Sequence, residues 1–203
     1  MAKYWSTIHE HDYDWDTVAS NYWKRYPNPN SNHVFSEDML SVQCNPEGVL
    51  KVRRLLTKTN KLPSWGEHLF NTRRVWLVEE TIVNPKTKEF VTYTRNLNLR
   101  FFMGTTEKVT YKPAKDDLKT VALKEVWIES EFYGLRSAIK KFGIDRFKKN
   151  CVKATEGFDW VLNRKDKGDN LWLHPKAFNL QRFSKYTYQL RCWHVDFLSD
   201  FKQ

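Results

Sequence analysis

Alternation of apolar and polar side chains predicts a series of β-strands along much of the chain. In a half-buried strand the pattern repeats every two residues, and turn-forming residues mark the ends. NPEG, NPKTKE and PAKDD are such turns, and no βαβ alternation indicates a parallel sheet. We expect an antiparallel sheet of six to seven strands, the first at an edge. The runs cover residues 3–11, 33–44, 49–58, 75–84, 89–99, 103–112 and 119–130.

Two segments have a helical pattern instead. Asp14 can cap a helix over residues 15–26, which Pro27 ends. A much longer pattern runs over residues 135–164, with Gly143 and Gly157 as its weak points. At about 1.5 Å per residue, this helix is long enough to cross a whole sheet. The fold class is therefore α+β, with a domain over residues 1–165 and an unassigned tail over 166–203.

One predicted strand carries an arginine on its apolar face. Alternation places Arg54 on the same face as Leu50, Val52 and Leu56. A guanidinium in that position must reach water, find a carboxylate or receive an anion, because it cannot lose its proton. A structural ion pair and an anion site are equally good interpretations.

The long helix carries polar residues on the stripe that we expect to face the sheet. Helical stepping aligns Ile139 and Phe142 with Arg146, Asn150 and Lys153. Burying two cations on one stripe is costly without an anion to hold them. The opposite arc is predicted to be solvated surface; it holds Lys141, Asp145, Lys148, Lys149, Val152, Glu156 and Asp159.

Arg25 follows the first helix, where a cation also complements the helix dipole. With the other inward cations it predicts a phosphate-binding cluster, since guanidinium groups match phosphate oxygens. A phosphate ligand with a long apolar body suits such a cluster among apolar faces. The segment after residue 58 has no clean period and predicts a lid or a membrane-touching loop, with an ordinary surface loop as the alternative. Its candidate contact residues are Lys58, Lys61, Leu62 and Trp65.

Composition narrows the functional class only in part. The 203 residues carry 34 Lys and Arg against 24 Asp and Glu, a net charge of +10, which favours an anionic partner such as nucleic acid, an acidic membrane or a small ligand. The three cysteines are far apart and indicate neither a disulfide framework nor a zinc site. No apolar run is long enough to span a membrane, and we expect neither a secretory signal nor an Arg-rich presequence.

Several motifs in order resemble a known family. RYPNP at 25–29, HV at 33–34, RRLLTKTNKLPSW at 53–65, YTRNL at 93–97 and FGIDRFKKN at 142–150 are similar to those of the PRELI-like family of mitochondrial intermembrane-space phospholipid transfer proteins. The resemblance covers residues 1–165, and RRLLTKTN is closer to the PRELI branch than to the slowmo branch. Residues 172–203 match nothing in the family.

The resemblance implies a helix-grip fold of the START and phosphatidylinositol-transfer kind, in which a curved antiparallel sheet wraps around the long helix. It also implies transfer of phosphatidic acid between the mitochondrial outer and inner membranes, which supports cardiolipin synthesis, and a heterodimer with a small twin CX9C helper protein. By motif match the headgroup residues are Arg25, Arg54, Arg146, Asn150 and Lys153. His33 also falls in a motif, but we interpret it as a packing histidine. No cofactor or metal is implied, and charge reversal at Arg54 is expected to abolish transfer without unfolding.

Other functions remain open at this point. The PRELI-like family also includes carriers associated with phosphatidylserine. A nucleic-acid-binding protein would place rings and cations on one exposed surface, whereas the patterns here direct them inward. No Ser-His-Asp, Cys-His or paired-carboxylate arrangement indicates an enzyme, and the six histidines show no metal-ligand spacing. A scaffold protein would have a cavity filled by its own side chains.

Overall fold

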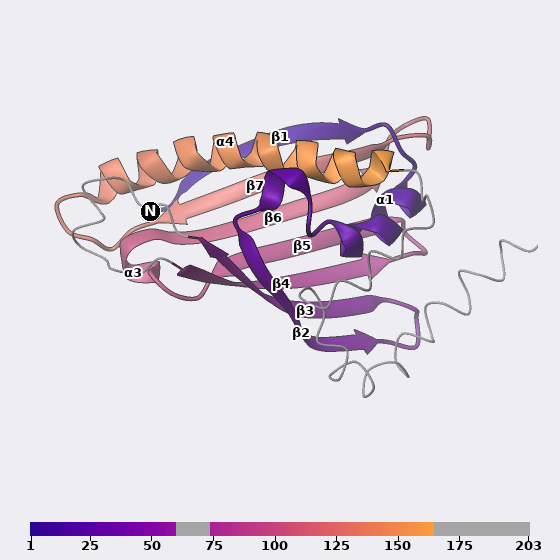
Figure 1. Ribbon diagram of the computed structural model, residues 1–203, viewed down its shortest axis with the longest axis horizontal. Helices are drawn as coiled ribbons and strands as arrows, with labels where there is room; N and C mark the ends of the chain where they lie inside the picture. The colour runs from indigo at the N-terminus through magenta and orange to yellow at the C-terminus, as the bar shows by residue number, and fades with distance from the viewer. Residues whose placement is uncertain (60–73, 165–203) are drawn as a thin grey trace, which may run out of the picture.

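Seven strands form one antiparallel sheet within the part of the chain that the computed structural model describes, residues 1–59 and 74–164. The strand order is β1-β7-β6-β5-β4-β3-β2, so β2 to β7 form a meander and β1 joins β7 at the edge (Figure 1). This confirms the predicted sheet and its first strand as an edge strand. The bounds are β1 Lys3–His11, β2 Val34–Cys44, β3 Leu50–Thr59, β4 Arg74–Asn84, β5 Glu89–Asn96, β6 Gly104–Pro113 and β7 Thr120–Glu129.

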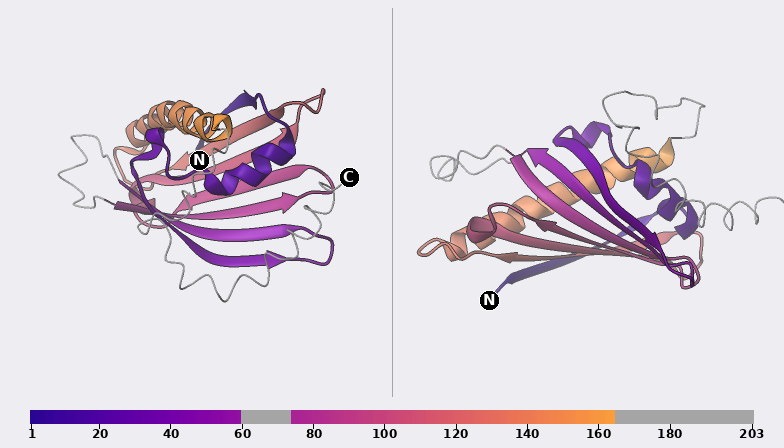
Figure 2. Two further views of the ribbon diagram at one scale, coloured as in Figure 1. Left: turned by 45° about the vertical axis from the view of Figure 1, so that its right-hand side comes forward. Right: turned by 90° about the horizontal axis from the view of Figure 1, so that it is seen from below.

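The long helix α4 and the short helix α1 lie on the same face of the curved sheet, which we call the inner face (Figure 2). α4 closely matches its predicted range, and Asp14 caps α1 by accepting a hydrogen bond from the backbone N–H of Thr17 at 2.9 Å. The arrangement is the expected helix-grip fold. In the described ranges no helix is both long and apolar enough to cross a membrane. The helical bounds are α1 Trp15–Asn21, η1 Tyr22–Lys24, η2 Pro29–Ser31, α3 Arg100–Met103 and α4 Arg136–Asn163.

Two glycines let α4 approach its neighbours closely. A Cβ atom at Gly143 would lie 2.8 Å from Cδ1 of Ile128 in β7, and one at Gly157 would lie 2.5 Å from Oδ1 of Asn28 beside η2. Both distances are far below van der Waals contact. Glycine weakens an isolated helix, but here it permits the contact that holds α4 against the sheet.

Aromatic side chains fill the end of the inner face beneath α1. Tyr22 makes edge contacts with Phe90, Tyr111 and Phe158, and the rings of Phe90 and Tyr111 stack with centroids 4.4 Å apart. All four are at least nine-tenths buried. Ring pairs of this kind add to the free energy gained by burial alone, so this end is a packed core.

The strand predicted over residues 89–99 ends earlier, at Asn96. The Asn96 side chain donates to the carbonyl oxygens of Asn98 and Met103 and accepts from the backbone N–H of Thr105. These bonds stabilise a bend in which Leu99 is left-handed, with φ of 59°, just before α3. A side chain that satisfies three backbone groups outcompetes the strand that alternation predicts.

Candidate functional site

A belt of polar side chains crosses the inner face of the sheet. The strand registers place Arg54 opposite Glu79, Glu79 opposite Thr94 and Thr94 opposite Glu107, on β3, β4, β5 and β6. Two residues further along, Lys124 on β7 lies opposite Val109 of β6. The belt therefore runs from β3 to β7 and separates the aromatic core from the rest of the inner face.

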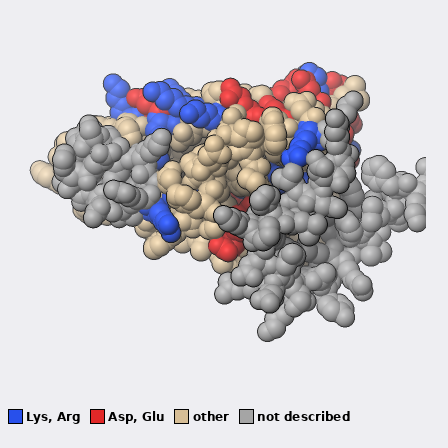
Figure 3. Space-filling model, viewed as in Figure 1, with Lys and Arg blue, Asp and Glu red and all other residues tan. Residues whose placement is uncertain are grey.

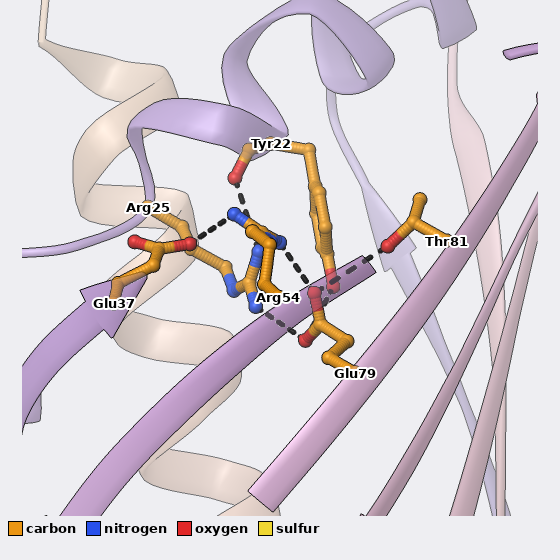
Figure 4. A network of polar contacts seen from close by, with 6 residues as sticks. All are labelled: Tyr22, Arg25, Glu37, Arg54, Glu79 and Thr81. Carbon is orange, nitrogen blue, oxygen red and sulfur yellow. Dashed lines mark hydrogen bonds and ion pairs between the residues drawn. The ribbon is translucent and has the colours of Figure 1, made fainter. Parts of the chain in front are cut away.

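At one end of the belt Glu79 joins two arginines (Figure 4). Its carboxylate accepts from Nη2 of Arg25 at 2.5 Å, from Nη2 of Arg54 and from the hydroxyl of Tyr22. Arg54 also donates through Nη1 to Glu37 of β2. Arg25, Arg54 and Glu79 are each less than a tenth exposed. Of the two interpretations of Arg54, a structural ion pair or an anion site, the structure thus shows the ion pair.

The charges in this network hold each other ionised. Burial alone would raise the pKa of Glu79, but Arg25 and Arg54 outweigh that effect and lower it to about 2. Burial acts to lower the pKa of Arg25, and the Glu79 carboxylate more than reverses this, so its pKa lies well above the usual value. The Glu79 carboxylate therefore stays ionised and holds both guanidinium groups in a fixed orientation.

Beyond this network the inner face and α4 enclose a cavity of about 260 Å³. Apolar side chains such as Leu77, Phe102 and Ile128 line part of it. Its charged lining in the described residues has more cations than carboxylates, which leaves an excess of two positive charges. The cations are Arg25, Lys58, Lys124 and Arg146, and the carboxylates are Glu79 and Glu107.

The predicted headgroup residues are only partly brought together. Arg25, Arg146 and Asn150 line the cavity, whereas Arg54 lies buried behind Glu79 and is not among the lining residues. Burial lowers the pKa of the Arg146 guanidinium. Lys153 is exposed and outside the described lining, so the prediction that it faces the sheet is wrong. Whether any of the five binds a headgroup stays a prediction.

The error at Lys153 has a simple geometric cause. The buried line of α4 runs from Ile139 through Gly143 and Cys151 to Thr155 and Phe158, about one residue around the helix from the predicted stripe. Small side chains allow the helix to approach the sheet on that side. Asp159, predicted to be solvated, lies at the rim of the buried face instead, where its Oδ1 is 2.5 Å from Nδ1 of His11.

The lid prediction falls mostly on residues outside the described ranges, including Lys61, Leu62 and Trp65. Lys58 is described: it lines the cavity, and its Nζ lies 5.7 Å from the ring centroid of Tyr26. Burial would raise the pKa of Tyr26, but Lys58 and Arg25 lower it below the usual value. His33 also lines the cavity and is exposed, so its interpretation as a packing histidine is wrong.

Three charged residues of the belt were missed by sequence reasoning: Glu79, Glu107 and Lys124. The pattern that indicates Arg54 also indicates these three residues, because alternation places each of them on the inner face of its strand beside apolar neighbours. Lys124 is only 6% exposed and donates to Oγ1 of Thr155. Burial raises the pKa of the Glu107 carboxyl, against the opposing effect of Lys58 and Lys124.

A separate group of side chains has metal-binding donor types. Alternation puts His9 and His11 on one face of β1, and their ring nitrogens and a carboxylate oxygen of Asp159 lie within 4.8 Å of one another. The Asp159 carboxylate is 3.2 Å from Nε2 of His9. Burial would raise the pKa of Asp159, but the two histidines lower it. These contacts join the end of β1 to α4 in the described structure.

Comparison with solved structures supports the fold. The chain aligns with TTHA0849 from Thermus thermophilus and with the Zhui aromatase/cyclase from Streptomyces at a TM-score of 0.54 each. The identities are 10% and 11%, and the alignments cover 79% and 81% of this chain and 97% and 95% of those chains. At such identity the likeness concerns the fold alone.

Sequence relatives are much closer. The model of the PRELI-like family matches residues 16–168. The mitochondrial PRELI domain-containing protein 1 of Gallus gallus is 38% identical over 81% of this chain and 78% of its own length, and the mitochondrial protein UPS1 of Saccharomyces cerevisiae is 33% identical over 77% and 91%. A slowmo homologue of Dictyostelium discoideum is 30% identical over 75% and 68%. The chain therefore belongs to the PRELI-like family of mitochondrial lipid-transfer proteins.

Proposed function

We propose that the protein carries phosphatidic acid between the mitochondrial outer and inner membranes, through the intermembrane space, and so supports cardiolipin synthesis. The observation that carries this proposal is the cavity lined by Arg25, Lys58, Lys124 and Arg146 together with apolar side chains. A phosphate headgroup supplies the negative charge that this lining lacks, and acyl chains suit its apolar walls. No bond is made or broken in such transfer.

The ion network determines which cations are available to a ligand. Glu79 and Glu37 already neutralise much of the charge of Arg25 and Arg54. Lys58 and Lys124, in contrast, form no ion pair with any carboxylate of the described residues. We therefore expect the two lysines, with Arg146 and Asn150 at the edge of α4, to make the main contacts with the phosphate.

The surface of α4 supports contact with anionic membranes. Lys and Arg gather over the first half of this helix (Figure 3), where Arg136, Lys141, Lys148 and Lys149 are exposed. Basic side chains near a bilayer are attracted to acidic lipids by about 1 kcal/mol each. The proposal also includes a heterodimer with a small twin CX9C protein; this rests on the family resemblance alone.

Lys58 gives the sharpest test. Lys58→Ala removes a cation from the cavity, so transfer of phosphatidic acid between liposomes should fall about tenfold, the effect of one charge-assisted hydrogen bond. The matched control is Lys51→Ala, since Lys51 lies on the same strand with its side chain on the outer, exposed face. Transfer should be measured with fluorescent phosphatidic acid and, in parallel, with phosphatidylcholine.

Equal transfer by Lys58→Ala and Lys51→Ala would contradict the headgroup assignment. A wild-type protein that moves phosphatidylcholine as fast as phosphatidic acid would contradict the cargo. Charge reversal at Arg54 is no longer a suitable test, because it would place a third carboxylate beside Glu37 and Glu79 and unfold the site rather than probe it.

A further inference from the structure

Two opposite charges at the β6–β7 end of the belt lie near each other without forming an ion pair. Glu107 is opposite Val126 and Lys124 is opposite Val109, so the two side chains are diagonal neighbours on the inner face. Lys124 acts to lower the pKa of the Glu107 carboxyl, yet no ion pair between them occurs in the described structure. Both line the cavity.

The ammonium group of Lys124 and the carboxylate of Glu107 face the same cavity. The Nζ atom of Lys124 donates to Thr155 and contacts the thiol of Cys151, which are neutral partners. The Glu107 carboxylate lines the cavity, whereas the neighbouring lysines bind other groups: Lys124 donates to Thr155 and Lys108 pairs with Glu125. The buried Lys124 ammonium group has only neutral partners, and the partly buried Glu107 carboxylate faces the cavity, so each is stabilised by a suitable ligand group. A ligand group that offers an acceptor to one and a proton to the other satisfies both.

Phosphate monoesters have this combination, whereas diesters lack it. A monoester has a second ionisation near pH 6, so it binds or releases a proton readily near neutral pH. It can therefore present an anionic oxygen to an ammonium group and share a proton with a carboxylate. A diester has one negative charge and no hydroxyl on phosphorus, so beside a carboxylate it binds only if that carboxyl group takes a proton from water.

We propose that Glu107 and Lys124 together select a phosphate monoester headgroup: Lys124 donates to an anionic phosphate oxygen, and Glu107 shares the proton of the P–OH group. This rests on the proposed lipid-transfer function and extends it, because Glu107 becomes the residue that rejects diester phospholipids. The Glu107 carboxylate lowers the affinity of the cavity for every anionic lipid. Such a cost is explained if the carboxylate repels diester lipids more strongly than monoester lipids and so makes binding selective.

The test compares phosphatidic acid, a monoester, with phosphatidylglycerol, an anionic diester without an amine, in liposome transfer. Wild-type protein should prefer phosphatidic acid. Glu107→Gln removes the repelling charge and keeps the shape, so it should narrow the ratio of the two rates about tenfold, mainly by faster transfer of the diester. Lys124→Met should slow both lipids. The matched controls are Glu125→Gln and Lys108→Met, which change a pair on the outer face of β7 and β6.

The outcomes separate the two proposals. If wild-type protein transfers neither lipid, the proposed function fails. If it prefers phosphatidic acid and Glu107→Gln keeps the same ratio, only the monoester selection is overturned. A preference for phosphatidylserine that Glu107→Gln abolishes would also overturn it, since Glu107 would then bind the amine. A protein that binds inorganic phosphate through Lys124 but transfers no phosphatidic acid would identify free phosphate as the ligand instead.

Discussion

Two ion pairs on neighbouring strands use the same chemistry on opposite faces of the sheet. Arg53 and Glu80 meet on the outer face with Nη2 and Oε2 3.0 Å apart, and their side chains are 55% and 42% exposed. Arg54 and Glu79, one residue along each strand, meet on the inner face and are 3% and 4% exposed. Water screens the outer pair, whereas the protein shields almost all of the inner pair from solvent. The contrast shows that burial, rather than residue type, decides what an ion pair does here.

Removing the inner carboxylate should have the largest effect. Glu79→Gln leaves the buried guanidinium groups of Arg25 and Arg54 with Glu37 as their one carboxylate in the described network. Breaking a buried pair in this way should lower the free energy of unfolding by about 3 to 5 kcal/mol. Urea denaturation monitored by circular dichroism measures the loss. A change below about 1 kcal/mol would show that water reaches the network.

Acid should erase this difference in stability. The pKa of Glu79 is about 4.5 in the unfolded chain and about 2 in the folded protein, so its contribution is complete above about pH 4.5 and disappears as the pH falls through about 2. The gap in unfolding free energy between wild type and Glu79→Gln should therefore shrink over this interval. Denaturation curves of both proteins at a series of pH values measure it. A gap that stays constant would mean that Glu79 is not ionised by its arginines.

Removing the carboxylate of the outer pair should have the smallest effect on stability. Glu80→Gln should change the free energy of unfolding by less than about 1 kcal/mol, because exposed pairs gain little in water. The same urea series measures the change, and salt serves as the control. About 1 M salt shortens the screening length to about 3 Å and should remove even this small effect. A loss as large as that of Glu79→Gln would contradict the assignment of stability to burial.

The two pairs also mark how far sequence reasoning extends. Alternation put Arg54 on the inner face, because the period of a strand is fixed by backbone geometry. It did not identify Glu79 as the partner. The register of β3 against β4 decides that pairing, and residues 60–73 between them are too many for a short turn to fix the register.

The long helix was harder to orient than the strands. A helix that repeats every 3.6 residues can be aligned along several i+3 and i+4 paths, and the path through Arg146, Asn150 and Lys153 is the one opposite the charged arc. The actual contact is decided by Gly143 and Gly157, whose missing side chains permit close packing. The resemblance gives the family. Alternation alone places Glu107 and Lys124 on the inner face, but the register of β6 against β7 is needed to show that they are neighbours.

The strand order also constrains how the molecule can assemble. β1 is the first strand along the chain, yet its partner is β7, so Lys3 pairs with Ile128 and His11 with Thr120. Strands β2 to β7 can pair one after another as the polypeptide emerges, but β1 must wait for more than half of the chain. Closing such a long loop is slow compared with forming hairpins. A nascent chain that stops before residue 120 would therefore expose to water both an unpaired first strand and the part of the polar belt that lies on β3 to β6.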